Sequence, residues 1–394
     1  MEPLLGKTLS ELQTIAIEAG LPRFVGKQLC EWLYRHRVSS FDEMSNISLK
    51  ARQALQQRYC IGRVPPTREA VSVDGTRKYL FPAHLTAQRS NSDSGLTAQR
   101  SDSAAVVESV YLPEEDRTTL CVSTQAGCKM GCRFCMTGTL GFHGNLTADA
   151  ILNQVFFFMS DSDSGLTNLV LMGEGEPMDN INPVLRALNV LTADWGLGWS
   201  PKRITVSTVG ILQKKPADSN TLSPFNSHFS PALERFLNET DCHLAISLHN
   251  AFPAERAAIM PAERLTPVTE VLDLVRKYDW SRQRRLSFEY ICWSGVNDDT
   301  AHARQLLRLV QGLPCRVNLI RFHQTNQQQS NQQRSDQPSN SAALHPTFPP
   351  SDEQRMIAFR DYLNAHGVTC TIRKSRGEDI LAACGMLVNA LDNG

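Results

Sequence analysis

Apolar residues in the first sixty positions recur every three or four residues, which is the spacing of amphipathic helices. The first stripe begins after Thr8, a residue type that favours helix starts, and Leu21-Pro22-Arg23 interrupts the pattern. The three stripes contain Leu9, Leu12, Ile15 and Ala16, then Phe24, Leu29, Trp32 and Leu33, and finally Leu49, Ala54 and Leu55. We therefore predict a small helical domain over residues 1–66.

The next segment, residues 67–113, alternates as β-strands do. Val71-Ser-Val73 and Lys78-Tyr-Leu-Phe81 flank Asp74-Gly75, a dipeptide typical of tight hairpin turns. A further strand is predicted at Val106–Leu112. Residues 67–113 are therefore expected to form a β extension.

Strand-like and helix-like patterns alternate from residue 118 onwards. The expected strands are Leu120–Ser123, Asn168–Met172, Ile204–Ser207, His243–Leu248, Leu286–Ile291 and Val317–Phe322. Helical patterns follow at about 147–159, 181–195, 231–238, 267–278, 299–311 and 352–366. Six such units predict an α/β fold whose parallel sheet is curved into a partial (β/α)6 barrel over residues 114–376, followed by a C-terminal segment, 377–394.

Three polar stretches interrupt these patterns. Residues 85–104 hold an imperfect repeat rich in Ser, Asn and Asp, and its phrase Ser92-Asp-Ser-Gly-Leu-Thr97 recurs at residues 162–167. Residues 213–230 are rich in Pro, Ser and Asn, and residues 326–347 in Gln, Asn and Ser. Segments of this composition bury too little apolar surface to fold, so we expect disordered insertions.

Composition narrows the class of protein. The formal net charge of the 394 residues is zero, so no general attraction to nucleic acid is expected, although a local basic patch remains compatible with it. Eleven cysteines suit reduced thiols and metal chemistry better than a disulfide framework. The first residues lack a signal-peptide pattern and no apolar run approaches a membrane span, so a cytoplasmic protein without a membrane partner is expected.

Basic side chains lie along the predicted N-terminal helices. A solvated helical face explains them most simply, and a module that holds RNA phosphates is the alternative. They are Arg23, Lys27, Arg35, His36, Arg37, Lys50, Arg52 and Arg58.

The segment Cys128-Lys-Met-Gly-Cys132-Arg-Phe-Cys135 carries three thiols in the spacing C-x3-C-x2-C. Three thiolates on one loop can each hold one iron of a [4Fe-4S] cluster and leave the fourth iron open to another ligand. A structural zinc site normally needs a fourth ligand, often from a second C-x2-C pair, which the sequence lacks. Zinc and coincidence remain the alternatives at this stage.

Further candidate residues come directly after the predicted strands. They include the Gly/Glu-rich loop Gly173-Glu-Gly-Glu176-Pro177, whose carboxylate suits an ammonium group, although an ordinary turn is the simpler explanation of this loop taken alone. In βα barrels the loops after the strands meet at one end, so these residues are expected to converge. Cys121 and Cys384, taken alone, are most simply buried structural cysteines.

Several motifs in the same order resemble the RlmN/Cfr family of radical S-adenosylmethionine (SAM) RNA methyltransferases, from about residue 8 to about residue 388 apart from the insertions. They are Thr119–Cys128, Cys132-Arg-Phe-Cys-Met-Thr-Gly, Gly175-Glu-Pro177, Ser247-Leu-His249, Arg373-Lys-Ser-Arg-Gly-Glu-Asp-Ile and Ala382-Ala-Cys384-Gly. The resemblance implies a barrel of the radical SAM type, with Cys128, Cys132 and Cys135 on the cluster. It implies SAM contacts from Gly175, Glu176, Ser207, Ser247, Leu248, His249 and His323, the last standing where the family has Asn.

The resemblance also implies a reaction. Cys384 would carry a methyl group taken from one SAM, a second SAM would yield a 5′-deoxyadenosyl radical, and the methyl carbon would add to C2 of an adenine. Cys121 would then release the product by forming a disulfide with Cys384, and Glu108 would accept a proton. The implied substrates are a 23S rRNA adenosine and an adenosine of the tRNA anticodon loop. A monomer served by an electron donor such as flavodoxin or ferredoxin is expected.

Three other functions stay open on the sequence alone. Methylation at adenine C8 uses the same residues, and a radical-generating activase for a partner protein needs neither Cys121 nor Cys384. A non-catalytic iron–sulfur or zinc RNA-binding protein is the third. If Cys121 and Cys384 do act together, the C-terminal segment must fold back over the mouth of the barrel.

Overall fold

The computed structural model describes residues 1–86, 105–160, 165–211, 231–280, 284–323, 348–383 and 385–387. The predicted insertions 213–230 and 326–347 and most of 85–104 lie outside the described residues, and so does Cys384. Within the described part of the chain, no helix is long and apolar enough to cross a membrane.

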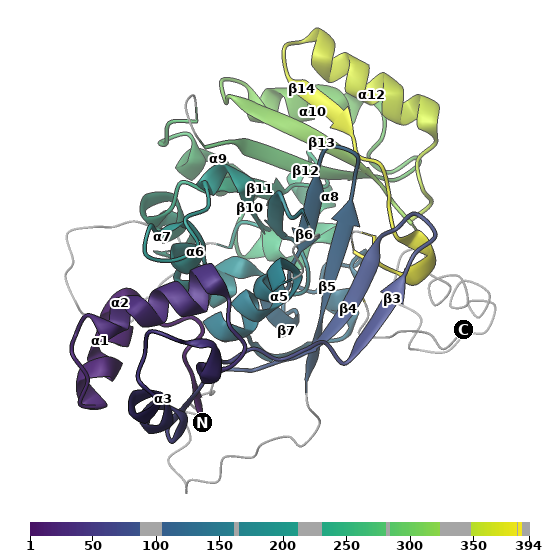
Figure 1. Cartoon of the computed structure of the whole chain (residues 1–394). Coiled ribbons are helices and arrows are strands. Elements are labelled where there is room, and N and C mark those ends of the chain that lie inside the picture. The colour runs from purple at the N-terminus through teal and green to yellow at the C-terminus, as the bar shows by residue number, and fades with distance from the viewer. Residues whose placement is uncertain are drawn as a thin grey trace, which may run out of the picture.

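A single ten-stranded sheet forms the centre of the molecule, with strand order β14-β13-β12-β11-β10-β9-β6-β5-β4-β3 (Figure 1). The strands from β6 to β14 run parallel, and β3 to β6 pair antiparallel. Their bounds are β3 Arg68–Val71, β4 Arg77–Pro82, β5 Val106–Pro113, β6 Thr118–Cys121, β9 Asn168–Leu171, β10 Ile204–Thr208, β11 His243–Ser247, β12 Leu286–Cys292, β13 Cys315–Arg321 and β14 Thr369–Ile372. The six predicted parallel strands are confirmed, and β14 adds a seventh.

Helices follow the parallel strands as predicted and cover the outer face of the curved sheet. They are α5 Ala148–Ser160, α6 Ile181–Thr192, α7 Pro231–Glu239, α9 Val268–Val275, α10 Thr300–Val310 and α12 Glu353–Ala365. Helix α6 illustrates the reason for this packing. Its apolar residues Val184, Leu188 and Leu191 recur at helical spacing, lie on one face and are buried. An additional short helix, α8 Pro253–Ile259, follows β11.

The N-terminal residues form the predicted helices: α1 Leu9–Glu18, α2 Val25–Cys30, which continues into the π-helical turn η1 Glu31–His36, and α3 Leu49–Gln56. Thr8 caps α1 in a capping box with Glu11, as its position suggested. The predicted place of Phe24 in the buried stripe is wrong, because this side chain is 63% exposed. Tyr34 of η1 packs against Phe156 and Trp195, so these helices share one hydrophobic core with the barrel.

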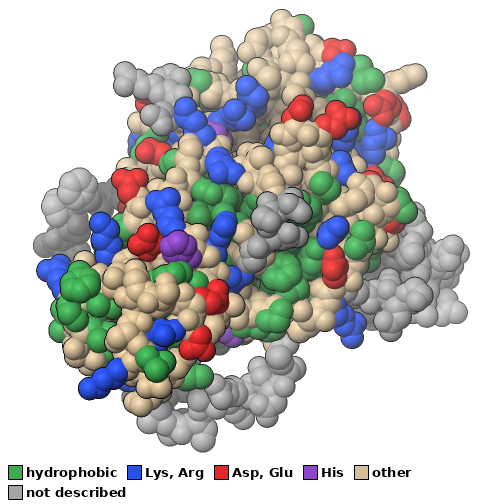
Figure 2. All heavy atoms as spheres, in the orientation of Figure 1, with side chains coloured by type: hydrophobic (Ala, Val, Ile, Leu, Met, Phe, Trp, Pro, Cys, Tyr) green, Lys and Arg blue, Asp and Glu red, His purple; other side chains and the backbone are tan. Residues whose placement is uncertain are grey.

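Shorter elements complete the chain. Strands β1 Glu2–Pro3 and β2 Tyr59–Cys60 pair with each other, and so do β7 Gln125–Gly127 and β8 Phe142–Asn145. Helix α4 spans Met136–Thr139. Single 3-10 turns lie at η2 Phe41–Glu43, η3 Pro177–Asn180, η4 Pro201–Arg203, η5 Pro261–Arg264 and η6 Glu378–Ile380. Over the N-terminal helices, basic and acidic side chains are interspersed (Figure 2), as on a solvated helical face.

Two predictions near the hairpin need correction. Strand β3 ends at Val71, not Val73, and a longer loop closes through the bond from the Ser72 N–H to the Thr76 carbonyl, so Asp74-Gly75 is not a two-residue turn. The insertion begins later than residue 85. Leu85 bridges to Leu146, and Thr86 N–H donates to the Asn145 carbonyl at 2.8 Å, so both residues belong to the packed structure.

Candidate active site

The three cysteines of the C-x3-C-x2-C motif lie on one loop between β7 and α4. Gly127 has a φ of +69°, and a Cβ there would lie 1.9 Å from the carbonyl oxygen of Gly141, so only glycine fits where the loop begins. Cys128 N–H donates to that same carbonyl at 2.9 Å. Cys135 N–H donates to the carbonyl of Cys132 at 3.1 Å, which closes a tight turn between these two cysteines.

The thiols fit a buried iron–sulfur cluster. Burial raises the pKa of Cys128 to about 12 and also raises the pKa values of Cys132 and Cys135, so free thiolates would be costly here and bound metal would compensate their charge. No three His, Cys, Asp or Glu side chains of the described residues converge on a point that could hold one metal ion.

Aromatic side chains pack against the cysteine loop. The ring of Phe134 meets that of His249 edge to face at 4.8 Å and that of Trp293 at 5.3 Å. Arg133 N–H donates to the carbonyl of Ile259 at 2.9 Å. These contacts fix the loop against the carboxyl ends of β11 and β12.

Glu176 follows β9 and is 2% exposed. Its carboxylate accepts hydrogen bonds from the Thr208 hydroxyl at 2.6 Å, the Val209 N–H at 2.9 Å and the Met178 N–H at 3.0 Å. Burial raises the pKa of Glu176 to about 7, although these hydrogen bonds oppose the rise. A carboxylate offers about four acceptor positions, so one remains for a ligand ammonium group.

Glu174, two residues earlier, was not singled out from the sequence. Its carboxylate accepts from the Glu108 N–H at 2.8 Å and from the Gly127 N–H at 3.1 Å, so it ties β5 to the start of the cysteine loop. Gly175 between the two acids has a φ of +95°, and a Cβ there would lie 2.4 Å from that of Gln125. The only sequence signal for Glu174 was a second acid in the same glycine-rich loop.

The ends of β10 and β11 meet beside this loop. The hydroxyl oxygens of Ser207 and Ser247 are 3.4 Å apart. Arg256 of α8, which the sequence analysis missed, is fully buried and donates to the carbonyls of Val209, Ser247 and Leu248 at 2.9–3.1 Å. Arg256 therefore holds the backbone at the carboxyl ends of β10 and β11 together.

His249 comes directly after the buried Leu248 and adopts a left-handed φ of +56°. Its Nδ1 accepts the Ile291 N–H at 3.1 Å. Burial and, to a smaller extent, the positive charge of Arg256 lower the pKa of His249 to about 3, so the ring is neutral at pH 7 and carries its proton on Nε2. The strain at this residue is consistent with a functional position.

His323 follows β13 and faces the segment after β14. Its Nδ1 lies 3.2 Å from the Glu378 carboxylate, and its Nε2 is hydrogen-bonded to the Ser375 hydroxyl. Both ring nitrogens therefore have protein partners, and a contact from His323 to a cofactor would require one of these bonds to be exchanged.

Cys121 ends β6 and lines a cavity of about 470 Å³ together with Ala383 and Gly385. Cys384 itself lies outside the described residues, but both of its neighbours are placed there. Met136 N–H, next to the cysteine loop, donates to the Gly385 carbonyl at 2.8 Å. The C-terminal segment thus folds back over the mouth of the barrel, as predicted.

Comparison with known proteins agrees with this arrangement. The family model described as the ribosomal RNA large subunit methyltransferase N-terminal domain matches residues 3–61. The model of the radical SAM superfamily matches residues 122–307, which include the cysteine loop.

Two relatives are similar over almost the whole chain. The "Probable dual-specificity RNA methyltransferase RlmN" of Phocaeicola vulgatus is 48% identical over 389 residues, which cover 98% of this chain and 95% of that protein. The relative of the same name from Porphyromonas gingivalis is 49% identical over 384 residues, covering 98% and 96%. The chain belongs to the RlmN family.

A solved structure of a radical SAM methyltransferase from Sphaerobacter thermophilus matches with a TM-score of 0.79 and 32% identity, over 98% of this chain and 99% of that one. The radical SAM barrel predicted from the sequence is therefore confirmed. The cofactors of an RlmN-type radical SAM enzyme are a [4Fe-4S] cluster and SAM.

One further feature of this RlmN-family site is a buried ion pair. Glu108 of β5 lies with its Oε1 3.1 Å from the Nζ of Lys78 of β4, and both side chains are fully buried. Lys78 Nζ also donates to the Leu381 carbonyl at 3.5 Å, three residues before Cys384. Lys78 stabilises negative charge on Glu108 and links it to the C-terminal segment. No sequence signal distinguished this lysine from an ordinary strand residue.

The tip of the β3–β4 hairpin is also hydrogen-bonded to the C-terminal segment. Asp379 accepts hydrogen bonds from the Ser72 hydroxyl at 2.5 Å and the Val73 N–H at 3.1 Å. Asp74 accepts the Gly377 N–H at 3.0 Å. Burial raises the pKa of Asp74, but hydrogen bonds from Thr76 and Gly377 outweigh it and lower the pKa to about 2. This RlmN-family hairpin therefore anchors the residues that lead to Cys384.

Proposed function

We propose that this chain methylates C2 of adenosine in 23S rRNA and in the tRNA anticodon loop, as a radical SAM enzyme. The observation that carries the proposal is the cavity shared by Cys121 and both neighbours of Cys384, beside the cysteine loop. The relatives' names, which include dual-specificity RNA methyltransferase, support RNA as the substrate.

Cys128, Cys132 and Cys135 would hold the cluster, which supplies the electron for reductive cleavage of SAM when bound. The residues proposed to bind SAM are grouped at the carboxyl ends of four strands. They are Gly175, Glu176, Ser207, Ser247, Leu248, His249 and His323.

Two cysteines would carry out the transfer. Cys384 would accept a methyl group on its sulfur, that group would lose one hydrogen atom to a 5′-deoxyadenosyl radical, and the resulting carbon radical would add to adenine C2. The Cys121 thiolate attacks the Cys384 sulfur, so that an S–S bond forms as the bond from sulfur to the RNA-linked carbon breaks. Glu108, paired with Lys78, is the proposed proton acceptor.

Methylation at adenine C2 explains the need for radical chemistry. Adenine C2 is electron-poor and does not attack the SAM methyl as a nucleophile, so a radical route is needed. The adenine must also leave its stack to reach the cavity, which favours RNA loops with splayed bases. The helical domain 1–66 would contribute to holding this RNA. A flavodoxin- or ferredoxin-type electron donor, a monomeric state and a cytoplasmic location belong to the same proposal.

The test combines cluster analysis with cysteine variants. Anaerobically reconstituted protein should hold about four irons per chain, and Ala at Cys128, Cys132 or Cys135 should abolish this. Cys384→Ala should prevent methyl loading altogether. Cys121→Ala should allow loading and addition but not release, so RNA should stay covalently attached to Cys384. Normal turnover by Cys121→Ala would overturn the residue assignment.

Nucleoside mass spectrometry of rRNA and tRNA from cells with and without the protein tests the product. We expect 2-methyladenosine to depend on the protein. If 8-methyladenosine depended on it instead, the C2 assignment would be wrong while the residue roles stood.

A further inference from the structure

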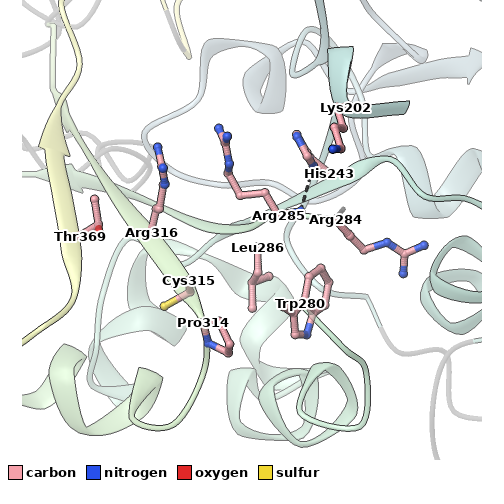
Figure 3. A pocket seen from close by; sticks show the side chains of 10 residues that line it. All are labelled: Lys202, His243, Trp280, Arg284, Arg285, Leu286, Pro314, Cys315, Arg316 and Thr369. Atoms are coloured by element: carbon pink, nitrogen blue, oxygen red, sulfur yellow. Dashed lines mark hydrogen bonds between the residues drawn. The ribbon is translucent and has the colours of Figure 1, made fainter. Parts of the chain in front are cut away.

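The end of the barrel opposite the cysteine loop carries a pocket of about 450 Å³. Four successive strands each contribute one basic side chain at their amino ends: Lys202 just before β10, His243 at the start of β11, Arg285 just before β12 and Arg316 within β13. Figure 3 shows Arg285 and Arg316 extending from neighbouring strands to the side of the sheet opposite the helices. Nothing in the proposed methyl transfer uses these residues.

The positive charge of this pocket is not compensated. Among the described residues, none of Lys202, Arg285 and Arg316 has a carboxylate oxygen within 4.0 Å. Arg284 differs, because it lies 3.8 Å from Asp241 and donates to a backbone carbonyl. The three uncompensated side chains are exposed to solvent and therefore available to a ligand.

His243 adds a neutral donor. Its Nδ1 accepts the backbone N–H of Arg285 at 2.8 Å, as Figure 3 marks, so its proton lies on Nε2. Burial and then the positive charges of Arg285, Lys202 and Arg284 together lower the pKa of His243 to about 4. The polar side chains that converge here are therefore mainly hydrogen-bond donors, which is the chemistry of an anion site.

The shape favours a chain of anions over a single one. Lys202 and Arg316 are three strand steps apart, about 14 Å at roughly 4.8 Å per step. Basic side chains spread over this span can each meet a different phosphate of a nucleic acid backbone, whose charges repeat along the strand. The cavity beside Cys121 is also lined by Lys202, Arg285 and Arg316, so one hollow runs from the methyl-transfer site to this end.

We propose that Lys202, Arg285 and Arg316 bind backbone phosphates of the substrate RNA at the amino ends of the barrel strands. The inference rests on the proposed function, because it takes RNA as the ligand. The RNA then has two anchor regions on the barrel. One lies near Cys121, where the adenine reacts, and the other lies about 20 Å away along the strands, where only the backbone is held.

The test compares two double variants that remove the same charge. One is Arg285→Gln with Arg316→Gln, and the control is Arg304→Gln with Arg308→Gln on exposed positions of α10. Binding of a tRNA transcript and of a 23S rRNA fragment is measured by fluorescence anisotropy over a range of KCl concentrations. Thermal unfolding establishes that both variants are folded.

Two lost phosphate contacts should lower the slope of log affinity against log salt by about 1.4, and the affinity near 0.1 M salt by about tenfold or more. The control should retain the wild-type slope. Equal slopes for the two double variants would overturn the proposal.

Two other results are also informative. If inorganic phosphate raised the unfolding temperature of wild type but not of Arg285→Gln/Arg316→Gln, while both bound RNA equally, the pocket would be a small-anion site and the RNA assignment wrong. If wild type itself bound neither RNA, the proposed function would fail and the phosphate site with it. Normal binding by wild type separates these two failures.

Discussion

Buried charged side chains hold the backbone around the site in place through hydrogen bonds and ion pairs. Arg256 holds three backbone carbonyls, Glu174 holds two backbone amides, and Lys78 faces Glu108. A buried charge is tolerated only when it is paired and hydrogen-bonded, so each of these groups fixes the position of its partners. At this scale the buried charges hold the neighbouring backbone in place through several hydrogen bonds each.

The Lys78–Glu108 pair gives a prediction about stability. Replacing Lys78 with Met leaves the fully buried Glu108 carboxylate without its ammonium partner, which should lower the free energy of unfolding by about 3 kcal/mol or more. Urea unfolding measures this change.

The matched control is the double variant Lys78→Met with Glu108→Leu. It replaces both charges with apolar groups and should recover most of the lost stability, since a buried pair is often worth no more than well-packed apolar residues. It should stay inactive if Glu108 accepts a proton. A single variant as stable as wild type would show that the pair does not support the fold.

Sequence reasoning picked out as candidates those residues whose motif is local. The three cysteines, Glu176 and His249 were recognisable because their spacing or motif lies within a few positions. Arg256, Glu174 and Lys78 were not, because their importance depends on partners 8 to 303 residues away that only the folded chain brings together. Burial of a charge cannot be read from a single position.

At the scale of elements, the hairpin and the C-terminal segment behave as one unit. The two regions are about three hundred positions apart, yet hydrogen bonds join Ser72 and Val73 to Asp379 and Asp74 to Gly377. The strands themselves were predictable from alternation and turn residues. Their loop was misjudged because Asp74 serves the C-terminal segment and Thr76 in place of a two-residue turn.

This anchoring predicts a local effect. Asp379→Ala removes two hydrogen bonds to the hairpin tip and should speed hydrogen exchange in residues 376–383 severalfold, with little change in global stability, because the lost contacts lie at the surface. Exchange measured by mass spectrometry, peptide by peptide, reports this.

Asp361→Ala is the matched control, since Asp361 pairs only with its neighbour Arg360 on the outer face of α12 in the described structure. Exchange of residues 376–383 should match wild type in this variant. Identical exchange in both variants would mean that the hairpin does not hold the segment.

At the scale of the whole molecule, alternation of strands and helices sufficed to predict the barrel. Each unit buries its own apolar stripe, so the pattern is visible in the sequence. The boundary between the helical domain and the barrel was less visible. Tyr34, Phe156 and Trp195 belong to one core, although each lies in a separately predicted unit.

Two deletions in the first insertion can test where the packed structure gives way to the polar segment. Replacing residues 87–104 with a short Gly/Ser linker should leave the unfolding temperature and RNA methylation close to wild type, because polar, low-complexity chain adds little to a core and loop closure costs little.

Replacing residues 84–104 instead removes Leu85, whose side chain packs on Gly144 of β8, and the hydrogen bond between His84 and Asp149. That longer deletion should destabilise the β7–β8 pair beside the cysteine loop and weaken cluster retention. If the two deletions unfolded at the same temperature, Leu85 and His84 would contribute nothing. If the shorter one lost activity, the polar segment would have a role that its composition does not indicate.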